Sequence, residues 1–591
     1  MISISYFKTL LALFFTLSFV ATAINIEAYP DMKPLPPQAE EEESDEQPKM
    51  PMGPMSKKKD YETIEEFLED GEYEHIDGFL DLYKDTEKNK YFMVLSKDDL
   101  NKEFLYFAYV LNAPPGSGVM TGEMIGDSQI GNGVILEFRE FKNKIGLYKK
   151  NTYFSNDTDN NIAKRDMTMI FEAFVSTFDP VVDEEERYLI NADKIFLSEM
   201  LTSISPNIPP EYREYYSVNL GKMVPSKTFI ENINNYDKNT NVKVNFGYYN
   251  PKPNQRNQVF AVADPRYTSV SFSHLFVEMP DDNFKPRLSD QRVGFYSAKI
   301  TDLSTYDRYP SRDVINRWRL EKKYPDQEIS EPVKPITFWV ENSTPDEIKP
   351  FVVAGIEGWN VAFEKAGFKN AIVAKIQPDD ADWDAGDVRY NVLRWTASPS
   401  PPFSGYGPSF VNPRTGEILG ADIMLEYGGM VGRLWRAEVF SKAGMIENAM
   451  DEEYAALDAE LEIRSSREIL AEQMSRCHAG IVMGRNSLLA AAAMRAYNFT
   501  DEEHAEFVRQ TLHRLVLHEV GHTLGMSHNM HASTMLSPHE IKDSEKVAEN
   551  GLCNSVMEYP SINFARKKSE QTRFYDDSPG PYDKWVIEYG Y

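Results

Sequence analysis

Cysteine is scarce in this chain, which has only Cys477 and Cys553 among its 591 residues. Neither lies in the N-terminal half. A thiolate from an N-terminal propeptide that blocks a metal site elsewhere in the chain is therefore excluded. Two cysteines in an exported chain favour one disulfide between them. The alternative is a pair of buried free thiols.

Basic residues and long apolar runs are also few. The chain has 63 lysines and arginines against 92 aspartates and glutamates, a formal charge of -29. Because binding to phosphates depends on clustered lysine and arginine, we expect no nucleic-acid partner. After residue 20 no apolar run is long enough to span a bilayer.

The N-terminal end has the pattern of an export signal. The apolar run Leu10 to Val20 follows Lys8 and precedes Ala21-Thr22-Ala23, which predicts a signal peptide over residues 1–23. An uncleaved membrane anchor is the alternative. We therefore expect a secreted protein, extracellular or periplasmic, with no integral membrane segment after signal cleavage.

Tryptophan is missing from the first half, because all seven tryptophans lie from Trp318 onward. This shift in composition supports a boundary near residue 320. Residues 24–59 are rich in proline, methionine and charge, which predicts a disordered linker. Residues 60–320 contain strand-like runs broken by turn residues, which predict one or more β-rich N-terminal domains of unknown function. The runs are Tyr91 to Leu95, Phe104 to Leu111, Val134 to Phe141, Val244 to Tyr249 and Ser269 to Phe276.

The most specific pattern is His518-Glu519-Val520-Gly521-His522, followed by Gly525 and His528. Four residues on an α-helix turn about 400°, so the first two histidines share one face and can bind one metal ion. Gly525 can adopt a left-handed conformation that ends the helix, so His528 can supply a third nitrogen. Three protein ligands leave a fourth position open, as catalytic zinc sites require. Glu519 is then placed to reach a water at that position.

The helix that carries this pattern is signalled at both ends. Thr500 and Glu503 form a capping box, and Gly525 marks the end of a broad apolar stripe. The other seven histidines do not join the set. A helix that merely carries surface histidines is the alternative.

A second segment, Ser555-Val556-Met557-Glu558-Tyr559, follows His528. The histidine pattern together with this Ser-x-Met-x-Tyr segment resembles the metzincin clan of zinc endopeptidases, in which a methionine turn forms a hydrophobic floor beneath the metal. The resemblance implies that Met557 is the floor residue and not a ligand. It also implies that Tyr559 is an additional, movable ligand that stabilises the oxyanion, as in astacins and serralysins. An ordinary packed tyrosine is the alternative for Tyr559.

Other stretches of the sequence point to one family within this clan. The runs Ala354-Gly355-Ile356-Glu357-Gly358-Trp359-Asn360 and Pro413-Arg414-Thr415-Gly416-Glu417-Ile418-Leu419 are similar to a family of secreted zinc-dependent metalloproteases. The catalytic part of that family is the Met-zincin domain, and uncharacterised strand-rich domains precede it. The resemblance covers residues from about 60 to 591 and is strongest from 330 onward.

The second half also has its own pattern of elements. Thr344, Pro345 and Glu347 predict the capped start of a long core helix that ends at Gly367. Strand-like runs follow, which implies a mixed twisted sheet with helices behind it. These runs are Asn370 to Lys375, Val388 to Trp395, Gly407 to Val411 and Glu417 to Leu425. Residues 430–498 predict a helical insertion before the zinc helix.

In metzincins one edge strand pairs with the extended substrate. Gly420 to Leu425 is the candidate by order along the chain, with a covered strand as the alternative. Such pairing would bind peptide backbone with limited sequence preference.

The fold we expect is α+β, with a metzincin-like catalytic domain over residues 321–591 after the β-rich region. We expect a zinc-dependent endopeptidase with one catalytic Zn²⁺, a protein or peptide substrate and Glu519 as general base. Whether the protein also binds a structural calcium ion is left open. The alternative from another class is a secreted binding or surface-assembly protein with a residual zinc site. A third hypothesis makes residues 60–300 a prodomain that inhibits the site until it is processed.

Overall fold

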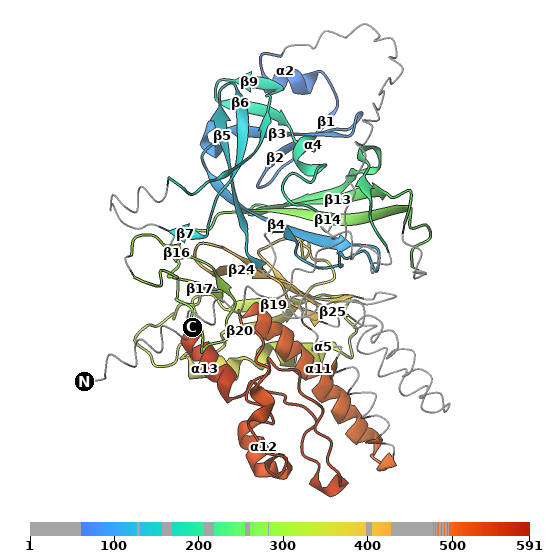
Figure 1. The fold of residues 1–591 in the computed structure, drawn as a ribbon, viewed down its shortest axis with the longest axis vertical. Coiled ribbons are helices and arrows are strands. Elements are labelled where there is room, and N and C mark those ends of the chain that lie inside the picture. Colours follow the sequence, from blue (N-terminus) through green and yellow to red (C-terminus); the bar gives the residue numbers. More distant parts are fainter. Residues whose placement is uncertain are drawn as a thin grey trace, which may run out of the picture. The chain divides into compact units, whose positions relative to one another are not determined.

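The computed structural model describes residues 61–591, apart from 127–130, 156–167, 206–217, 254–260, 282, 306, 397–404, 427–476 and several positions between 478 and 495 (Figure 1). The predicted signal peptide, the predicted linker and most of the predicted insertion at 430–498 lie outside the described residues. Asp60–Tyr591 forms one unit that includes both sides of the predicted boundary at 320. In the described part of the chain, no helix combines the length and the apolar character needed to cross a membrane.

The N-terminal half contains two antiparallel sheets (Figure 1). The first has the order β1-β2-β3-β10-β9, with strands β1 Tyr73–Ile76, β2 Asp81–Asp85, β3 Lys90–Ser96, β10 Arg187–Asn191 and β9 Val182–Glu184. The second has the order β11-β13-β14-β4-β5-β6-β8, and β12 also pairs with β13. Its strands are β11 Lys222–Met223, β12 Phe229–Asn235, β13 Asn239–Tyr249, β14 Tyr267–Glu278, β4 Glu103–Asn112, β5 Val134–Phe141, β6 Lys144–Lys149 and β8 Ala173–Phe178. Short helices α2 (Ile64–Glu69) and α4 (Asp193–Phe196) accompany them.

All five strand predictions in this region are confirmed, and Val134–Phe141 matches β5 residue for residue. One hydrophobic cluster joins the two sheets, with Leu82 and Met93 from the first and Tyr106, Val242 and Phe272 from the second. Apolar residues on the inward faces of the strands therefore build a core between the sheets.

His274 on β14 is a polar member of this core and is 1% exposed. Its Nδ1 lies 2.9 Å from the hydroxyl of Tyr106, and its Nε2 lies 3.2 Å from the carbonyl oxygen of Phe196. Burial lowers the pKa of His274 to about 3. The folded protein thus holds this imidazole neutral where the unfolded chain would protonate it.

We expect His274 to make the protein sensitive to acid. Below the ordinary histidine pKa of about 6.5 the unfolded state binds a proton that the folded state does not. Stability is therefore full above that pH and falls, by about 1.4 kcal/mol per pH unit, as the pH drops towards 3. His274→Gln should flatten the slope of unfolding temperature against pH between 6.5 and 4, whereas exposed His539→Gln should not. An unchanged slope in His274→Gln would contradict this account.

The C-terminal half contains a mixed sheet with the order β20-β19-β21-β25-β22. Its strands are β19 Ile336–Val340, β20 Ile372–Ile376, β21 Asn391–Thr396, β22 Gly405–Tyr406 and β25 Ile423–Glu426. Neighbouring strands are parallel except for β22, which runs antiparallel to β25. The sheet therefore contains both parallel and antiparallel pairs.

The C-terminal half also contains α-helices (Figure 1). They are α5 Lys349–Glu357, α6 Asn360–Lys365, α11 Asp501–Thr523, α12 Ser544–Asn550 and α13 Pro581–Gly590. Helix α5 lies on α11, and α13 lies on α6. A second hydrophobic cluster fills the space between sheet and helices and includes Phe338, Trp359, Leu517 and Met557.

The prediction of one long core helix is wrong in two respects. The chain forms α5 and α6, because the amide of Trp359 bonds to the carbonyl of Ile356, three residues back, at 3.4 Å. The predicted cap also fails, since α5 begins after Ile348 without a side-chain cap, and the buried hydroxyl of Thr344 has no hydrogen-bond partner among the described residues. The predicted end at Gly367 agrees with its φ of 89°.

The predicted substrate edge at Gly420 to Leu425 is also wrong. The run Glu417 to Leu425 is divided between β24 (Glu417–Ala421) and β25 by Asp422, whose amide bonds to the carbonyl of Pro408. Strand β24 lies between β18 (Arg317–Trp318) and β23 (Ser409–Val411), and β25 lies between β21 and β22. The strands at the two ends of the described sheet are instead β20 and β22.

The two halves share packing. A third cluster combines Phe107 of β4, Leu275 of β14 and Phe410 of β23. The β-rich half is thus continuous with the core that supports the histidine helix.

The remaining short strands are β7 Phe154–Ser155, β15 Ser297–Ala298, β16 Thr301–Asp302 and β17 Val314–Ile315.

Candidate metal centre

Helix α11 positions two of the three predicted metal ligands. Its first turn has the predicted capping box, in which the amide of Glu503 donates to Thr500 Oγ1 at 3.3 Å. It ends at Thr523, and Gly525 follows with a φ of 94°. A Cβ atom on Gly525 would lie 1.9 Å from the carbonyl oxygen of Asn316. Only glycine therefore fits the turn that returns the chain to His528.

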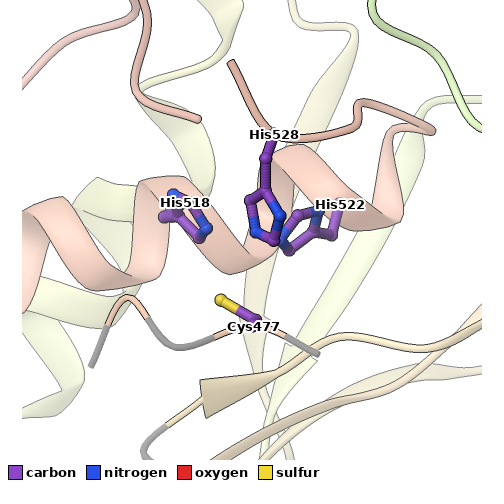
Figure 2. A group of neighbouring side chains, drawn as sticks. All are labelled: Cys477, His518, His522 and His528. Atoms are coloured by element: carbon purple, nitrogen blue, oxygen red, sulfur yellow. The ribbon is translucent and has the colours of Figure 1, made fainter. Parts of the chain in front are cut away.

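The imidazoles of His518, His522 and His528 converge on one point (Figure 2). His518 is 1% exposed and His522 is 6% exposed. The Nδ1 of His518 lies 2.7 Å from the carbonyl oxygen of Val556, and that of His522 lies 2.9 Å from the carbonyl oxygen of Met526. Because a carbonyl can only accept, each Nδ1 carries the proton and each Nε2 keeps a lone pair that faces the cluster.

The donor atoms fit a zinc ion. In the described part of the chain, the buried His518 Nε2 has no hydrogen-bond partner. The Nε2 atoms of His522 and His528 lie 3.0 Å apart, a separation at which two lone pairs repel unless a proton or a cation lies between them. Burial lowers the pKa of His518 and lowers that of His522 to about 4, so both rings stay neutral, as metal ligands must. Three imidazole ligands form a donor set that zinc prefers.

Glu519 lies beside this cluster and is 0% exposed. Burial raises the pKa of its carboxyl group to about 8. Its Oε1 accepts a hydrogen bond from Cys477 Sγ at 3.3 Å, and its buried Oε2 has no partner among the described residues. Strand β22 passes close to it, because a Cβ atom on Gly405 would lie 2.4 Å from Oε1. The carboxylate thus lies between the histidines and the last strand of the sheet.

Met557 packs directly beneath the histidine helix and is 0% exposed. A Cβ atom on Gly521 would lie 2.3 Å from its Sδ, so the glycine between the two helical histidines lets the methionine approach. The hydroxyl of Tyr559 lies 2.8 Å from His528 Nε2. Met557 therefore lies against the histidine helix, and Tyr559 lies against His528.

Two buried charged residues that the sequence analysis missed hold the methionine turn. Arg514 is 1% exposed and donates to the carbonyl oxygens of Ser555, Val556 and Glu558. Asp583 on α13 is 0% exposed and accepts from Ser555 Oγ and from the amide of Val556 at 2.5 and 2.7 Å. Arg514 lies one turn before His518 on the buried face of α11, and this position in the sequence could have identified it.

Residues of the β-rich half also reach the site. The amide of Tyr296 donates to the carbonyl of Gly525 at 2.8 Å, and the amide of Ser527 donates to the carbonyl of Gly294 at 2.9 Å. The hydroxyl of Tyr296 lies 3.4 Å from His522 Nδ1. The segment from 294 to 296 therefore holds the turn that presents His528. No local pattern near Tyr296 signalled this contact.

The predicted disulfide is not formed, since both cysteines are free thiols. Cys477 lies at the histidine cluster, whereas Cys553 packs in a separate hydrophobic cluster with Ala532, Val547 and Leu552. Burial raises the pKa of both thiols. The sequence analysis identified Cys477 as a disulfide partner and missed its place beside the metal ligands.

Comparison with protein families gives two matches. Residues 500–591 match a family described as Met-zincin. This Met-zincin region carries α11, His528, the methionine turn and α13, and together with the histidine cluster it indicates a zinc metalloprotease. Residues 128–323 match a domain of unknown function (DUF5117). Searches of curated proteins and of solved structures give no match.

Proposed function

We propose that this protein is a secreted zinc endopeptidase. The observation that carries the proposal is the convergence of three buried or half-buried imidazoles, with Glu519 at their side, within the Met-zincin region. His518, His522 and His528 would hold the ion. When bound, zinc acidifies a water and polarises the scissile carbonyl.

The chain's own groups would then handle the protons. Glu519 would accept the proton of the attacking water and later deliver it to the leaving amine. The Tyr559 hydroxyl, next to His528, would donate a hydrogen bond to the developing oxyanion. Met557 and the carbonyls that orient the imidazoles would keep the ligands in place.

Strand β22 is the proposed place for an extended substrate. It pairs with β25 and is the last strand in the order of this sheet. Gly405 on β22 contacts the Glu519 carboxylate, so a peptide added along this strand would pass beside the general base. Backbone pairing of this kind favours polypeptide substrates with limited sequence preference.

The β-rich half would be a permanent support of the site. Its segment 294–296 bonds to the turn before His528, and Trp318 donates from its indole nitrogen to the carbonyl of Thr523 at 2.8 Å. Removal of residues 60–300 as a prodomain would take away the segment 294–296 and so release the turn that presents the third ligand. These contacts therefore favour a structural role over cleavable inhibition.

Substrate profiling with metal control tests the proposal. Purified protein incubated with a mixed peptide library should cleave internal peptide bonds, and mass spectrometry would identify the products. A zinc chelator should abolish cleavage, and added zinc should restore it. A surface-assembly protein with a residual zinc site would bind zinc and leave the library intact at every zinc concentration. The same result in wild type and in Cys477→Ser, which lacks the thiol beside Glu519, would refute the peptidase.

A further inference from the structure

Cys477 belongs to the same group of donor atoms as the three histidines. Its Sγ and one imidazole nitrogen from each of His518, His522 and His528 lie within 4.8 Å of one another. Figure 2 shows the sulfur directed towards the histidine helix, on the side where the rings of His518 and His522 face it. Cys477 precedes a segment in which the described positions between Ala479 and Ala496 are helical. It therefore reaches the site from the part of the chain before α11.

The chemistry of this donor set is that of a closed zinc site. One thiolate and three imidazoles complete a tetrahedral shell, whereas a catalytic shell needs a position for water. A second observation points to the same ligand, because the buried Nε2 of His518 faces the group without a hydrogen-bond partner among the described residues. A thiol that served only for packing would not need to lie within 4.8 Å of three imidazole nitrogens.

The thiol also engages the group that would activate the water. Cys477 Sγ donates to Glu519 Oε1 at 3.3 Å. The other carboxylate oxygen, Oε2, is buried. The same side chain therefore occupies both the neighbourhood of the open metal position and the hydrogen-bonding site of the proposed general base.

We infer that Cys477 is a fourth, displaceable zinc ligand that keeps the enzyme in a latent state. The inference rests on the proposed zinc site. On binding, the S–H bond breaks, its proton passes to Glu519 Oε1, and the sulfur electron pair forms the bond to zinc. On activation, the sulfur–zinc bond breaks, the proton returns from Glu519 to the sulfur, and water takes the vacated position. Latency would thus come from a cysteine on the C-terminal side of the chain.

Zinc K-edge X-ray absorption of the full-length, zinc-loaded protein tests the ligand directly. The expected spectrum has one sulfur neighbour at about 2.3 Å besides nitrogen neighbours at about 2.0–2.1 Å. Cys477→Ser should lose the sulfur neighbour, and Cys553→Ser, the matched control, should keep it. A wild-type spectrum with nitrogen and oxygen neighbours only would overturn the inference and leave the proposed peptidase intact. Failure of the protein to bind zinc would refute both.

Cleavage by the same variants tests the latency. Cys477→Ser should cleave a library peptide at least about tenfold faster than wild type at equal zinc content, whereas Cys553→Ser should match wild type. The wild-type spectrum needs no variant, so a Cys477→Ser protein that failed to fold would leave the ligand test decisive. Equal rates for folded Cys477→Ser and wild type would overturn the latent state.

Discussion

Glu519→Gln is expected to bind zinc as wild type does and to lose peptide hydrolysis by about 10³-fold or more. Glutamine keeps the size of the side chain but cannot take a proton from water, and general acid–base catalysis contributes about 10²- to 10⁴-fold to enzymatic rates. Glu519 would act twice in one cycle, first on the water and then on the leaving amine. Zinc content and cleavage of one library peptide should be measured on the same sample.

The stability of this variant provides an independent check. In the metal-free protein burial raises the pKa of Glu519 to about 8. An acid whose pKa is raised on folding costs stability progressively as pH rises from its ordinary value to the folded one. Glutamine removes that cost, so metal-free Glu519→Gln should unfold at a temperature equal to or above that of wild type at pH 8. Glu502→Gln, on the same helix, should retain cleavage, and full activity of Glu519→Gln would rule out the assigned base.

His528→Ala is expected to lower zinc affinity by more than about 10²-fold and to abolish cleavage. Loss of a group that only orients a ligand costs about 10- to 100-fold in metal affinity, and loss of a ligand itself should cost more. His528 is half-buried in the turn after α11. The change should therefore leave the fold intact, which circular dichroism would verify.

His531→Ala is the matched control for this ligand. His531 is exposed, lies three residues further along and contacts Thr534 at 3.0 Å, away from the cluster of donor atoms. Zinc affinity measured by competition with a chromophoric chelator should be unchanged in His531→Ala. Equal affinity in both variants would remove His528 from the metal site.

The parts of the site set by local sequence could be predicted. The His518 and His522 pair follows from helical spacing, the start of α11 from its capping box, and the return to His528 from Gly525. The β-strands of the N-terminal half were also visible, because their apolar runs are bounded by turn residues. Each of these features depends on residues close together in the chain.

The parts set by tertiary contacts could not be predicted. Tyr296 reaches the site from 226 residues before His522, and Cys477 reaches Glu519 from 42 residues away. The role of a buried arginine such as Arg514 depends on the carbonyl oxygens that accept its hydrogen bonds, and these come from residues far along the chain. The break at Asp422 likewise depends on Pro408, so the run around it was predicted as a single strand and its edge was misplaced.

The packing of α5 on α11 shows the same limit. A Cβ atom on Gly355 would lie 2.6 Å from the Cβ of Val516, so this glycine serves close helix contact and not a helix end. Trp359 donates from its indole nitrogen to the carbonyl of Leu517 at 3.0 Å, one residue before the first metal ligand. The sequence indicated an apolar helix here, but only the packed structure shows which residues it supports.

A zinc titration of the metal-free protein tests the central claim most directly. Zinc would be added in substoichiometric steps, and the cleavage rate of one library peptide would be measured at each step together with the bound zinc. The account predicts a rate that rises in proportion to bound zinc and reaches its plateau at one ion per chain. A rate that does not depend on bound zinc, or no cleavage at full occupancy in both wild type and Cys477→Ser, would contradict it.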